Sequence, residues 1–478
     1  MDFFGRKQEI RDLMALWGKR TGSLVTCRGR RRIGKSTLIE RFALLSEARF
    51  IRIEGVRPRA GYDDDQERQV FAAQLAAQTD DNGAVPKNWL EAFTRLNDAI
   101  DDNGRTVVLL DEVSWMAAYE PMFADLFKIV WDGSLSKHDR LILVLCGSVS
   151  AWIKEEFVDN GAFYGRRSLD LIIPELPLNE CVKFWGEAAS RIDLREIADV
   201  LSVTGGVPRY LREIDPGLSA CENIKRLAFR PKSVLREDFD EMFSDVITRQ
   251  PTLTGRIVRT LVNGALSVSE IADALGMGKG GKISSALEQL SEAGLVAVDA
   301  GRNPETGTLV RERCYRLKDN YARFYLKYIE PVRPIIDSGA YRFVSLEGLD
   351  GWESLMGLQF ENLIVNNYAA LIPHLRLGNS LIESAAPYRR QRSSSPASGV
   401  QIDFLIQTRH NNYVIEIKRQ REIGREVIDE VKARLAKIRQ SRGRSNRPVL
   451  VYEGHLAPIV ETEGYFDSLV SFRVLLGL

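Results

Sequence analysis

The chain has 478 residues, of which 44% are hydrophobic and 27% charged, and its formal net charge is +1. This composition is ordinary for a globular protein, and the length predicts about three domains because single cores rarely exceed about 250–300 residues. The near-zero net charge excludes a chain that is basic throughout, so a nucleic-acid-binding surface has to be local.

Cysteine, histidine and hydropathy patterns narrow the class further. Five isolated cysteines and four scattered histidines disfavour disulfides and a thiolate or histidine metal site. No apolar run reaches the about 18 residues of a membrane-spanning helix, and residues 1–4 do not open a signal peptide. We therefore expect a cytoplasmic protein with no membrane partner.

The first predicted element is a helix near the N-terminus. Apolar residues recur at helical spacing between Ile10 and Trp17, after the segment Phe4-Gly5-Arg6. Because this segment precedes the first strand, Gly5 and Arg6 are candidate contacts of an adenine base. A plain packing helix explains the pattern equally well.

Residues 29–37 read GRRRIGKST and fit the phosphate-binding P-loop pattern G-x-x-x-x-G-K-[ST]. The two glycines let successive backbone N–H groups face phosphate oxygens, Lys35 supplies a charge, and the Ser36 hydroxyl is a hard ligand for Mg²⁺. A strand expected at 23–27 and a helix from Thr37 complete the required order. We predict that ATP, with Mg²⁺, is bound by Gly29, Arg30, Arg31, Arg32, Ile33, Gly34, Lys35, Ser36 and Thr37.

A second motif follows a strand at 50–53 and a polar, mostly helical stretch from about 55 to 104. Residues 106–110 form an apolar run that predicts a buried parallel strand ending at Asp111 and Glu112. Since ligands bind at the carboxyl ends of such strands, Asp111 is expected to hold Mg²⁺ and Glu112 to act as general base.

The next strand, expected at 141–148, ends at Ser148. Ser148 is a candidate sensor of the γ-phosphate, and the alternative is a simple strand cap. Of the following pair, Arg166 or Arg167 is a candidate arginine finger that would reach the nucleotide of a neighbouring copy in a homo-oligomer. A solvated or ion-paired surface is the alternative for these two arginines.

These motifs, together with residues 204–211 (TGGVPRYL), resemble the archaeal-type P-loop ATPase family, a branch close to the AAA+ and STAND ATPases. The resemblance covers roughly the first half of the chain and continues downstream. It implies an α/β P-loop NTPase core with an ASCE-type parallel sheet over residues 1–175. It also implies a helical lid over 176–245, in which Gly206 and Pro208 lie over the nucleotide base. Without the resemblance, residues 205–208 predict a helix-breaking turn.

Residues 246–335 predict a winged helix-turn-helix. Helices are expected at 257–262, 267–276 and 282–290, and strands at 293–298 and 314–317 flank a wing tip at 301–307. The helix at 282–290 is the second helix of the helix-turn-helix. With the turn before it, this helix offers Lys279, Lys282 and Gln289 to DNA, and these side chains suit contacts with phosphates better than contacts with bases. An interdomain spacer is the alternative role for this domain.

The C-terminal part, residues 336–478, predicts a helix at 357–364, a strand at 400–406, a turn at 411–412 and a return strand at 413–418. Glu416 and Lys418 share a strand face, and a hairpin places Asp403 beside them. Two carboxylates around Mg²⁺ can activate a water, and a lysine can neutralise charge on a phosphate. A cross-strand charge pair is the alternative.

This set resembles the active site of the PD-(D/E)xK nuclease superfamily, with Glu361 in the upstream-helix position. The resemblance implies a C-terminal α/β restriction-endonuclease-like domain in which Glu361, Asp403 and Glu416 bind metal. Related domains often carry an acidic residue two positions before the aspartate, where this chain has Gln401. A local set of basic side chains suits a DNA backbone: Arg389, Arg390, Arg392, Arg419, Arg421, Arg425, Lys432, Arg434, Lys437, Arg439, Arg442 and Arg444.

The sequence thus predicts an ATPase whose nucleotide cycle controls a DNA-binding C-terminal domain, with Mg²⁺-dependent DNA cleavage left open. The alternative is a nucleotide-controlled regulatory or defence switch that binds DNA or protein without cleaving it.

Overall fold

The computed structural model describes residues 3–101, 103–148, 150–246, 251–278, 280–310, 312–390, 399–438 and 443–478. It divides into two compact units: an N-terminal unit, Gly5–Pro174, and a C-terminal unit, Glu175–Leu478, which the first residues of the chain join. In the described ranges, the helices are all too short or too polar to cross a membrane.

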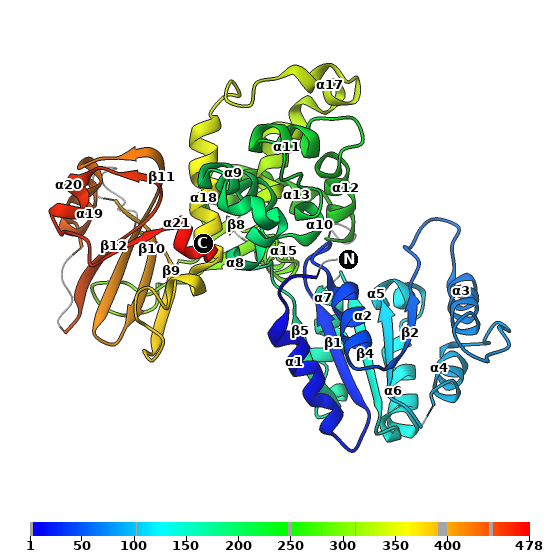
Figure 1. Cartoon of the computed structure of the whole chain (residues 1–478). Coiled ribbons are helices and arrows are strands. Elements are labelled where there is room, and N and C mark those ends of the chain that lie inside the picture. The colour runs from blue at the N-terminus through cyan, green and yellow to red at the C-terminus, as the bar shows by residue number, and fades with distance from the viewer. Residues whose placement is uncertain are drawn as a thin grey trace. The chain divides into compact units, whose positions relative to one another are not determined.

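The N-terminal unit is an α/β layer built on five parallel strands in the order β2-β3-β4-β1-β5 (Figure 1). Strand β4 therefore separates the P-loop strand β1 from β3. The elements are α1 (Lys7–Ala15), β1 (Ser23–Arg28), α2 (Lys35–Leu45), β2 (Arg49–Glu54), α3 (Asp64–Ala76), α4 (Trp89–Asp98), β3 (Thr106–Asp111), α5 (Val113–Met116), α6 (Phe123–Gly133), β4 (Leu141–Gly147), α7 (Ser150–Ile153) and β5 (Arg167–Ile172).

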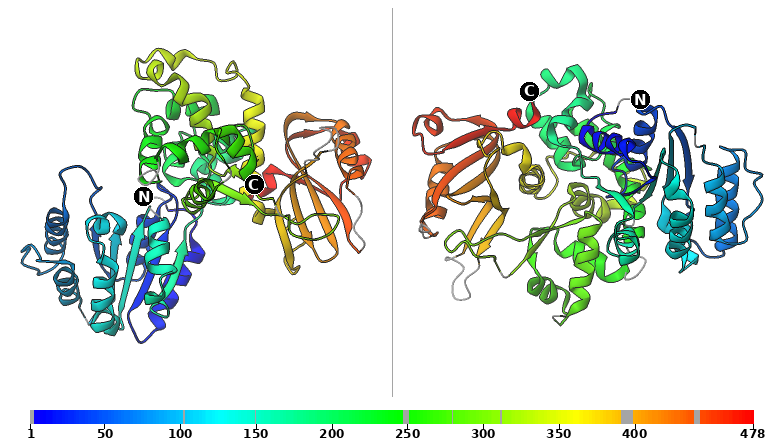
Figure 2. Two further views of the ribbon diagram at one scale, coloured as in Figure 1. Left: turned by 180° about the vertical axis from the view of Figure 1, so that it is seen from behind. Right: turned by 90° about the horizontal axis from the view of Figure 1, so that it is seen from below.

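Uninterrupted apolar runs explain the middle of this sheet. Strands β3 and β4 are buried along their whole length, as expected for parallel strands covered on both faces. Helices α3 and α4 lie at the β2 edge of the sheet, in both views of Figure 2. Their aromatic residues Phe71, Trp89 and Phe93 join Phe123 and Phe127 of α6 in one core. The same core includes Leu24 of β1 and Leu110 of β3, so the helices pack against the two strands whose carboxyl ends carry the motifs.

The C-terminal unit begins with helices and a small sheet of order β6-β8-β7. The elements of this part are α8 (Leu178–Cys181), α9 (Leu194–Thr204), α10 (Pro208–Leu211), α11 (Ala220–Ala228), α12 (Val234–Val246), α13 (Pro251–Thr260), β6 (Leu266–Ser267), α14 (Val268–Leu275), α15 (Gly281–Glu292), β7 (Val296–Asp299), β8 (Cys314–Leu317), α16 (Asn320–Phe324) and α17 (Arg333–Asp337). Lys279, predicted to face DNA, lies outside the described residues.

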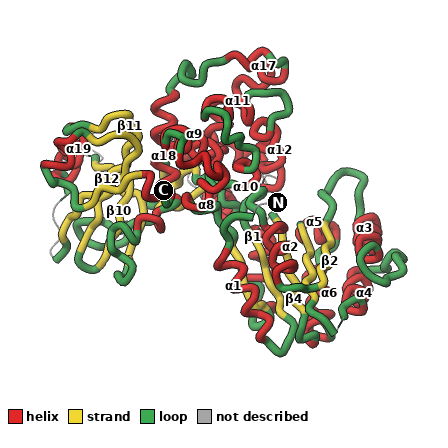
Figure 3. The backbone as a smooth tube through the Cα atoms, viewed as in Figure 1, coloured by secondary structure: helices red, strands yellow, loops and turns green. Residues whose placement is uncertain are grey.

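The same unit continues into a mixed sheet of order β13-β12-β11-β10-β9, whose strands gather beside α19 in Figure 3. Strands β9, β10 and β11 run antiparallel, whereas β11, β12 and β13 are parallel. The elements are α18 (Trp352–Asn366), β9 (Ile382–Arg390), β10 (Val400–Thr408), β11 (Asn411–Ile423), α19 (Glu426–Ala436), β12 (Ser445–Leu456), α20 (Pro458–Thr462), β13 (Ser468–Ser471) and α21 (Phe472–Leu476).

The turn predicted at 411–412 is wrong, because both asparagines belong to β11 and Asn412 pairs with Gln407 across the hairpin. The side chain of Asn412 is fully buried and donates to the Pro304 carbonyl at 3.1 Å and to Asn446 Oδ1 at 3.0 Å. Asparagine usually favours turns, but these buried hydrogen bonds keep Asn412 in the strand.

Candidate functional site

The P-loop connects β1 to α2 as predicted. Glycine is needed at two positions of the loop, for a different reason at each. A Cβ on Gly29 would lie 2.6 Å from the Ile173 carbonyl oxygen, and the residue has φ +149°. Gly34 has φ +89° and caps the first turn of α2. Side chains at these positions would clash or strain the backbone, so the loop can wrap an anion only with glycine there.

Lys35 and Ser36 sit at the start of α2 and face the predicted nucleotide site. The buried Lys35 ammonium donates to the carbonyls of Gly29 at 2.9 Å and Arg30 at 3.1 Å. The Ser36 hydroxyl donates to Asp111 Oδ2 at 2.7 Å. The hydroxyl and the carboxylate predicted to hold Mg²⁺ are thus together at the ends of α2 and β3, and both are hard oxygen donors that suit this ion.

Arg52 also contacts Asp111, and this residue was missed from the sequence. It donates from β2 to Asp111 Oδ2 at 2.9 Å and to Glu40 and Glu54 at 2.9 Å each. The sequence gives little indication of this role, since an arginine in a strand of alternating polar and apolar residues is not distinguished from other exposed arginines. The guanidinium occupies the same carboxylate oxygen that Ser36 uses, so a metal ion at Asp111 would compete with it.

Glu112 and Ser148 form the other half of this site. The backbone N–H and the hydroxyl of Ser148 both donate to Glu112 Oε2, at 3.0 and 2.9 Å. Glu112 has φ +50°, a conformation that costs a non-glycine residue free energy and is often found at active sites. Burial raises the pKa of the Glu112 carboxyl, although Lys35 and the two Ser148 donors oppose the rise. Ser148 thus orients the predicted base.

The other predicted nucleotide contacts divide between the two units. Arg6, the residue before α1, donates to the carbonyls of Ile33 at 3.3 Å and Pro174 at 2.7 Å, so the Gly5-Arg6 segment borders the P-loop. The remaining loop residues, Arg30, Arg31, Arg32 and Thr37, lie between β1 and the first turn of α2. Pro208 begins α10 in the C-terminal unit, and its contact with the nucleotide base stays a prediction.

The arginine pair has partners inside its own unit. Both nitrogens on one edge of the Arg166 guanidinium bind Asp132, at 2.6 and 2.8 Å. Arg167 begins β5 and donates to the carbonyls of Phe157 and Val158 at 2.9 and 3.2 Å. In this arrangement both side chains are ion-paired or hydrogen-bonded within the chain. This agrees with the alternative to an arginine finger, a solvated or ion-paired surface.

The C-terminal residues predicted to form a second acidic centre come together in the hairpin of β10 and β11. Asp403 Oδ2 accepts the backbone N–H of Ile417 at 3.0 Å, and Lys418 Nζ lies 3.1 Å from Glu416 Oε1. Lys418 also donates to Glu430 of α19 at 2.7 Å. The alternation of the strand puts Glu416 and Lys418 on one face, as the spacing predicted.

Glu361 of α18 belongs to the same electrostatic cluster. Burial, followed by repulsion from Asp403, raises the pKa of Glu361 to about 8 and that of Glu416 to about 7. Burial also raises the pKa of Asp403, against its bond from Ile417 and the charge of Arg434. Carboxyls that share a buried site resist simultaneous ionisation, and added positive charge relieves that repulsion.

In this structure positive charge comes from Lys418 and from Arg434 of α19. Arg434 Nη1 binds Glu416 and lies 3.5 Å from Asp403 Oδ1. Over the described ranges, no three His, Cys, Asp or Glu side chains are arranged closely enough to hold a metal ion. Glu361, Asp403 and Glu416 are therefore coupled electrostatically but do not form a finished metal-ligand set while Arg434 bridges two of them.

The predicted cationic surface is largely neutralised. Arg389 pairs with Glu270, Arg390 with Glu305, Arg419 with Asp199, Arg425 with Glu463 and Arg444 with Glu383. Lys432 lies 3.9 Å from Glu463 and over the ring of Tyr465. Arg392, Arg439 and Arg442 are outside the described residues. The local excess of positive charge is therefore smaller than the sequence indicated.

The parallel sheet, the P-loop and the Ser36–Asp111–Glu112 constellation define a P-loop ATPase. Residues 3–214 match a family described as an ATPase domain predominantly from Archaea. The chain is 22% identical over 363 residues, 76% of each sequence, to the uncharacterized protein MJECL04 of Methanocaldococcus jannaschii. The protein is accordingly an enzyme that hydrolyses ATP.

Comparison with solved structures finds one with the same fold at low sequence identity and another that aligns more loosely. The Walker-type ATPase PABY2304 of Pyrococcus abyssi aligns over 68% of this chain and 96% of that chain, with a TM-score of 0.50 and 20% identity. The ORC2 protein of Aeropyrum pernix aligns over 71% of this chain and 95% of that chain, with a TM-score of 0.45 and 16% identity.

Proposed function

We propose that the ATPase cycle of this protein controls a DNA-binding C-terminal domain that cleaves DNA with Mg²⁺. The observation that carries the proposal is the meeting of Asp403, Glu416 and Lys418 on one hairpin, with Glu361 from α18 in the same cluster. Carboxylates that repel one another in a buried site are stabilised by a divalent cation, and the cation can activate a water beside a phosphate.

Four domains serve this function: a P-loop core at 1–175, a lid at 176–245, a winged helix at 246–335 and a nuclease-like domain at 336–478. The succession of α13, β6, α14, α15, β7 and β8 supports the winged helix. The succession of α18, three antiparallel strands, α19 and a parallel strand supports the last domain.

In the ATPase core, Ser36 and Asp111 would hold Mg²⁺ on the phosphates, and the ion would neutralise charge that develops there during hydrolysis. Lys35 would leave its two carbonyl partners for the β- and γ-phosphates. Glu112, oriented by Ser148, would accept the proton of the attacking water.

Plasmid cleavage tests the nuclease proposal. We expect the wild-type protein to nick or linearise plasmid in Mg²⁺ or Mn²⁺, and Asp403→Asn to lower the rate at least about 100-fold because a metal ligand is lost. ATP hydrolysis should stay unchanged, as should both activities in the exposed control Asp429→Asn. Cleavage by Asp403→Asn at the wild-type rate would remove the site.

A second candidate function is a nucleotide-controlled switch that binds DNA or protein without cleavage. The Arg434 bridge between Glu416 and Asp403 favours it, because the guanidinium already neutralises the carboxylates. This function predicts ATP-dependent binding of a partner and no cleavage by the wild type. A salt titration identifies a nucleic-acid partner, since its binding constant falls linearly with log salt.

We also propose a homo-oligomer in which Arg166 or Arg167 reaches the nucleotide of a neighbouring copy. Arg166 is the better placed, because about a third of its side chain is exposed at its pair with Asp132. ATPase turnover per chain should rise with protein concentration in the wild type but not in Arg166→Ala. Turnover that is independent of concentration contradicts the trans contact.

A further inference from the structure

Arg434 of α19 engages two of the four carboxylate oxygens of Asp403 and Glu416. Its Nη1 binds Glu416 Oε2 and lies 3.5 Å from Asp403 Oδ1. The other two oxygens are engaged as well, because Glu416 Oε1 lies 3.1 Å from Lys418 Nζ and Asp403 Oδ2 accepts the Ile417 N–H at 3.0 Å. Arg434 thus holds one oxygen of each carboxylate, the pair of atoms that a bridging cation would need.

The two carboxylates are buried, whereas the guanidinium that covers them reaches solvent. The side chains of Glu416 and Asp403 are 4% and 10% exposed, and that of Arg434 is 32% exposed. Exposed side chains change rotamer rapidly, so the Arg434 side chain can move into water and uncover the carboxylates.

Helix α19 itself can stay in place during such a change. Val427, Ile428 and Val431 of the helix pack in one core with Leu450 of β12, and this core holds the helix on the sheet. Arg434 lies in the last turn of the helix, beyond these core residues. Release of the carboxylates therefore requires a rearrangement of one side chain only.

Release of Arg434 leaves negative charge that another cation has to offset. Lys418 is shared between Glu416 and Glu430, at 3.1 and 2.7 Å, so it cannot replace Arg434 at Asp403 as well. Buried carboxylates repel one another, and a divalent cation carries the two positive charges that offset Asp403 and Glu416. Arg434 and a divalent cation are therefore alternative partners of the same oxygens.

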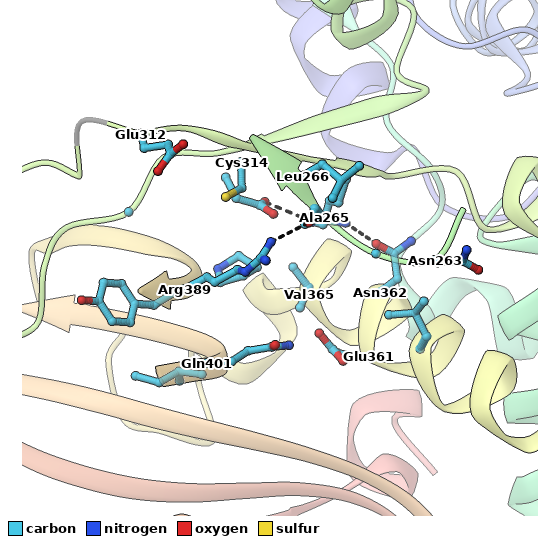
Figure 4. A pocket seen from close by; sticks show the side chains of 18 of the residues that line it. Asn263, Ala265, Leu266, Glu312, Cys314, Glu361, Asn362, Val365, Arg389 and Gln401 are labelled. Carbon is cyan, nitrogen blue, oxygen red and sulfur yellow. Dashed lines mark hydrogen bonds and ion pairs between the residues drawn. The ribbon is translucent and has the colours of Figure 1, made fainter. Parts of the chain in front are cut away.

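Open space lies beside the third carboxylate of the cluster, Glu361. Figure 4 shows Glu361 of α18 facing Gln401 of β10, and both residues line a cavity of about 370 Å³ in the C-terminal unit. Mg²⁺ usually keeps several of its waters when it binds carboxylates, so it needs such space. The contacts of Arg434, rather than a lack of room beside Glu361, therefore oppose the binding of a cation.

We propose that Arg434 is a displaceable counter-ion, which keeps divalent cations from Asp403 and Glu416 until a phosphate of the DNA backbone binds its guanidinium. Arginine suits this exchange, since its planar fork binds carboxylates and phosphates alike. The charges balance, because the guanidinium pairs with the phosphodiester and the two carboxylates are left to a divalent cation. This inference rests on the proposed function and names the regulation of its site: metal and DNA bind cooperatively.

A Mn²⁺ titration of the full-length protein, without nucleotide or DNA, tests the competition. We expect Arg434→Met to bind Mn²⁺ at least about tenfold more tightly than the wild type, because the competing cation is gone. Electron paramagnetic resonance of the free ion measures the affinity. Adding Glu416→Gln to Arg434→Met should remove the gain, which assigns it to this centre rather than to Asp111.

Lys437→Met is the matched control, because Lys437 is an exposed cation that directly follows the last residue of α19. It should bind Mn²⁺ as the wild type does. Equal Mn²⁺ affinity of the wild type and Arg434→Met would overturn the proposal.

The thermal stability of the variants keeps the test decisive if Arg434→Met is poorly folded without metal. Saturating Mn²⁺ should raise the Tm of Arg434→Met more than that of the wild type, because the ion replaces the lost charge. Arg434→Lys keeps a charge but lacks the fork, so its Mn²⁺ affinity should lie between those of the other two proteins. A Tm of Arg434→Met that responds to Mn²⁺ no more than that of the wild type contradicts the exchange.

The salt dependence of DNA binding tests the contact with phosphate. Each phosphate contact steepens the fall of the logarithm of the binding constant with log salt by about 0.9. With Mn²⁺ the wild-type slope should be steeper than that of Arg434→Met by about this amount, whereas in EDTA the two slopes should agree, because the carboxylates then hold Arg434. Any effect of Lys437→Met on the slope should be the same in both conditions.

Fluorescence anisotropy of a short labelled duplex with phosphorothioate linkages, which resist cleavage, measures these slopes. Equal slopes in Mn²⁺, a difference that persists in EDTA, or a wild type that binds no duplex would each overturn the exchange. The Mn²⁺ titration requires no cleavage. Failure of the wild type to cut plasmid therefore contradicts the proposed nuclease and leaves the result for Arg434 standing.

Discussion

At the scale of single residues, the ATPase site depends on how Glu112 is held. A general base must be ionised, and burial raises the pKa of Glu112. The acid limb of the kcat profile should therefore lie at higher pH than the pKa of an ordinary glutamate carboxyl. The Ser148 hydroxyl stabilises the ionised form, so Ser148→Ala should move that limb to still higher pH.

Steady-state ATPase rates between pH 5 and 9 measure this shift. Glu112→Gln should lower kcat at least about 100-fold at every pH while nucleotide binding remains, because only the base is lost. Lys35→Ala should abolish nucleotide binding and serves as the opposite control. A Ser148→Ala profile that superimposes on the wild type would contradict the role of its hydroxyl.

Arg52 is the second residue with a predicted kinetic effect. Its guanidinium shares Asp111 Oδ2 with Ser36, so it competes with Mg²⁺ for that oxygen. Arg52→Gln should lower the Mg²⁺ concentration for half-maximal ATPase activity about two- to fivefold, as expected for a partly exposed pair worth about 0.4–1 kcal/mol. Arg49→Gln on the same strand is the control, because Arg49 donates to the carbonyls of Ala99 and Gln78 rather than to Asp111. An unchanged Mg²⁺ dependence in Arg52→Gln would rule out this competition.

At the scale of elements, contiguous motifs could be predicted and distant pairings could not. The P-loop, the strand ending at Asp111 and the Glu416/Lys418 strand follow from local spacing alone. The partner of Asp111 at Arg52 and the partner of Glu416 at Arg434 come from other elements, and no periodicity in the sequence relates them. Charge density along the chain was likewise a poor guide, because distant carboxylates neutralise most of the arginines.

One such pairing connects α9 to the hairpin strand β11. The Arg419 side chain is 1% exposed, and its guanidinium binds Asp199 of α9 and Glu353 of α18, the latter at 3.0 Å. Arg419 follows Lys418 directly, so this pairing holds the strand of the second acidic centre against the proposed lid. Strand and helix should therefore separate only with loss of a buried ion pair.

We expect Arg419→Met to lower the free energy of unfolding by about 3–5 kcal/mol, because Asp199 is left charged and largely buried. The double variant Arg419→Met/Asp199→Asn should recover part of that loss, since it removes the unpaired charge. Urea unfolding followed by circular dichroism measures both, with the exposed Arg421→Met as control. A loss no larger in Arg419→Met than in Arg421→Met would show that the pairing is not stabilising.

At the scale of the whole molecule, the chain divides into two units. Control of the C-terminal domain by the ATPase cycle therefore requires energetic coupling between these units. The P-loop, Asp111 and Glu112 lie in Gly5–Pro174, whereas the second acidic centre lies in Glu175–Leu478. A nucleotide can regulate the second unit only if its binding free energy differs between states of that unit. Coupling of this kind appears as stabilisation of a unit that the nucleotide does not touch.

Calorimetric unfolding of the full-length protein measures that coupling. A non-hydrolysable ATP analogue with Mg²⁺, at 100 times its Kd, should stabilise the N-terminal unit by about 2.7 kcal/mol and raise the Tm of its transition. If the nucleotide controls the C-terminal unit, the transition of that unit should rise as well, and neither should move in Lys35→Ala. A shift confined to one transition would separate ATP hydrolysis from the C-terminal chemistry and leave two independent activities in one chain.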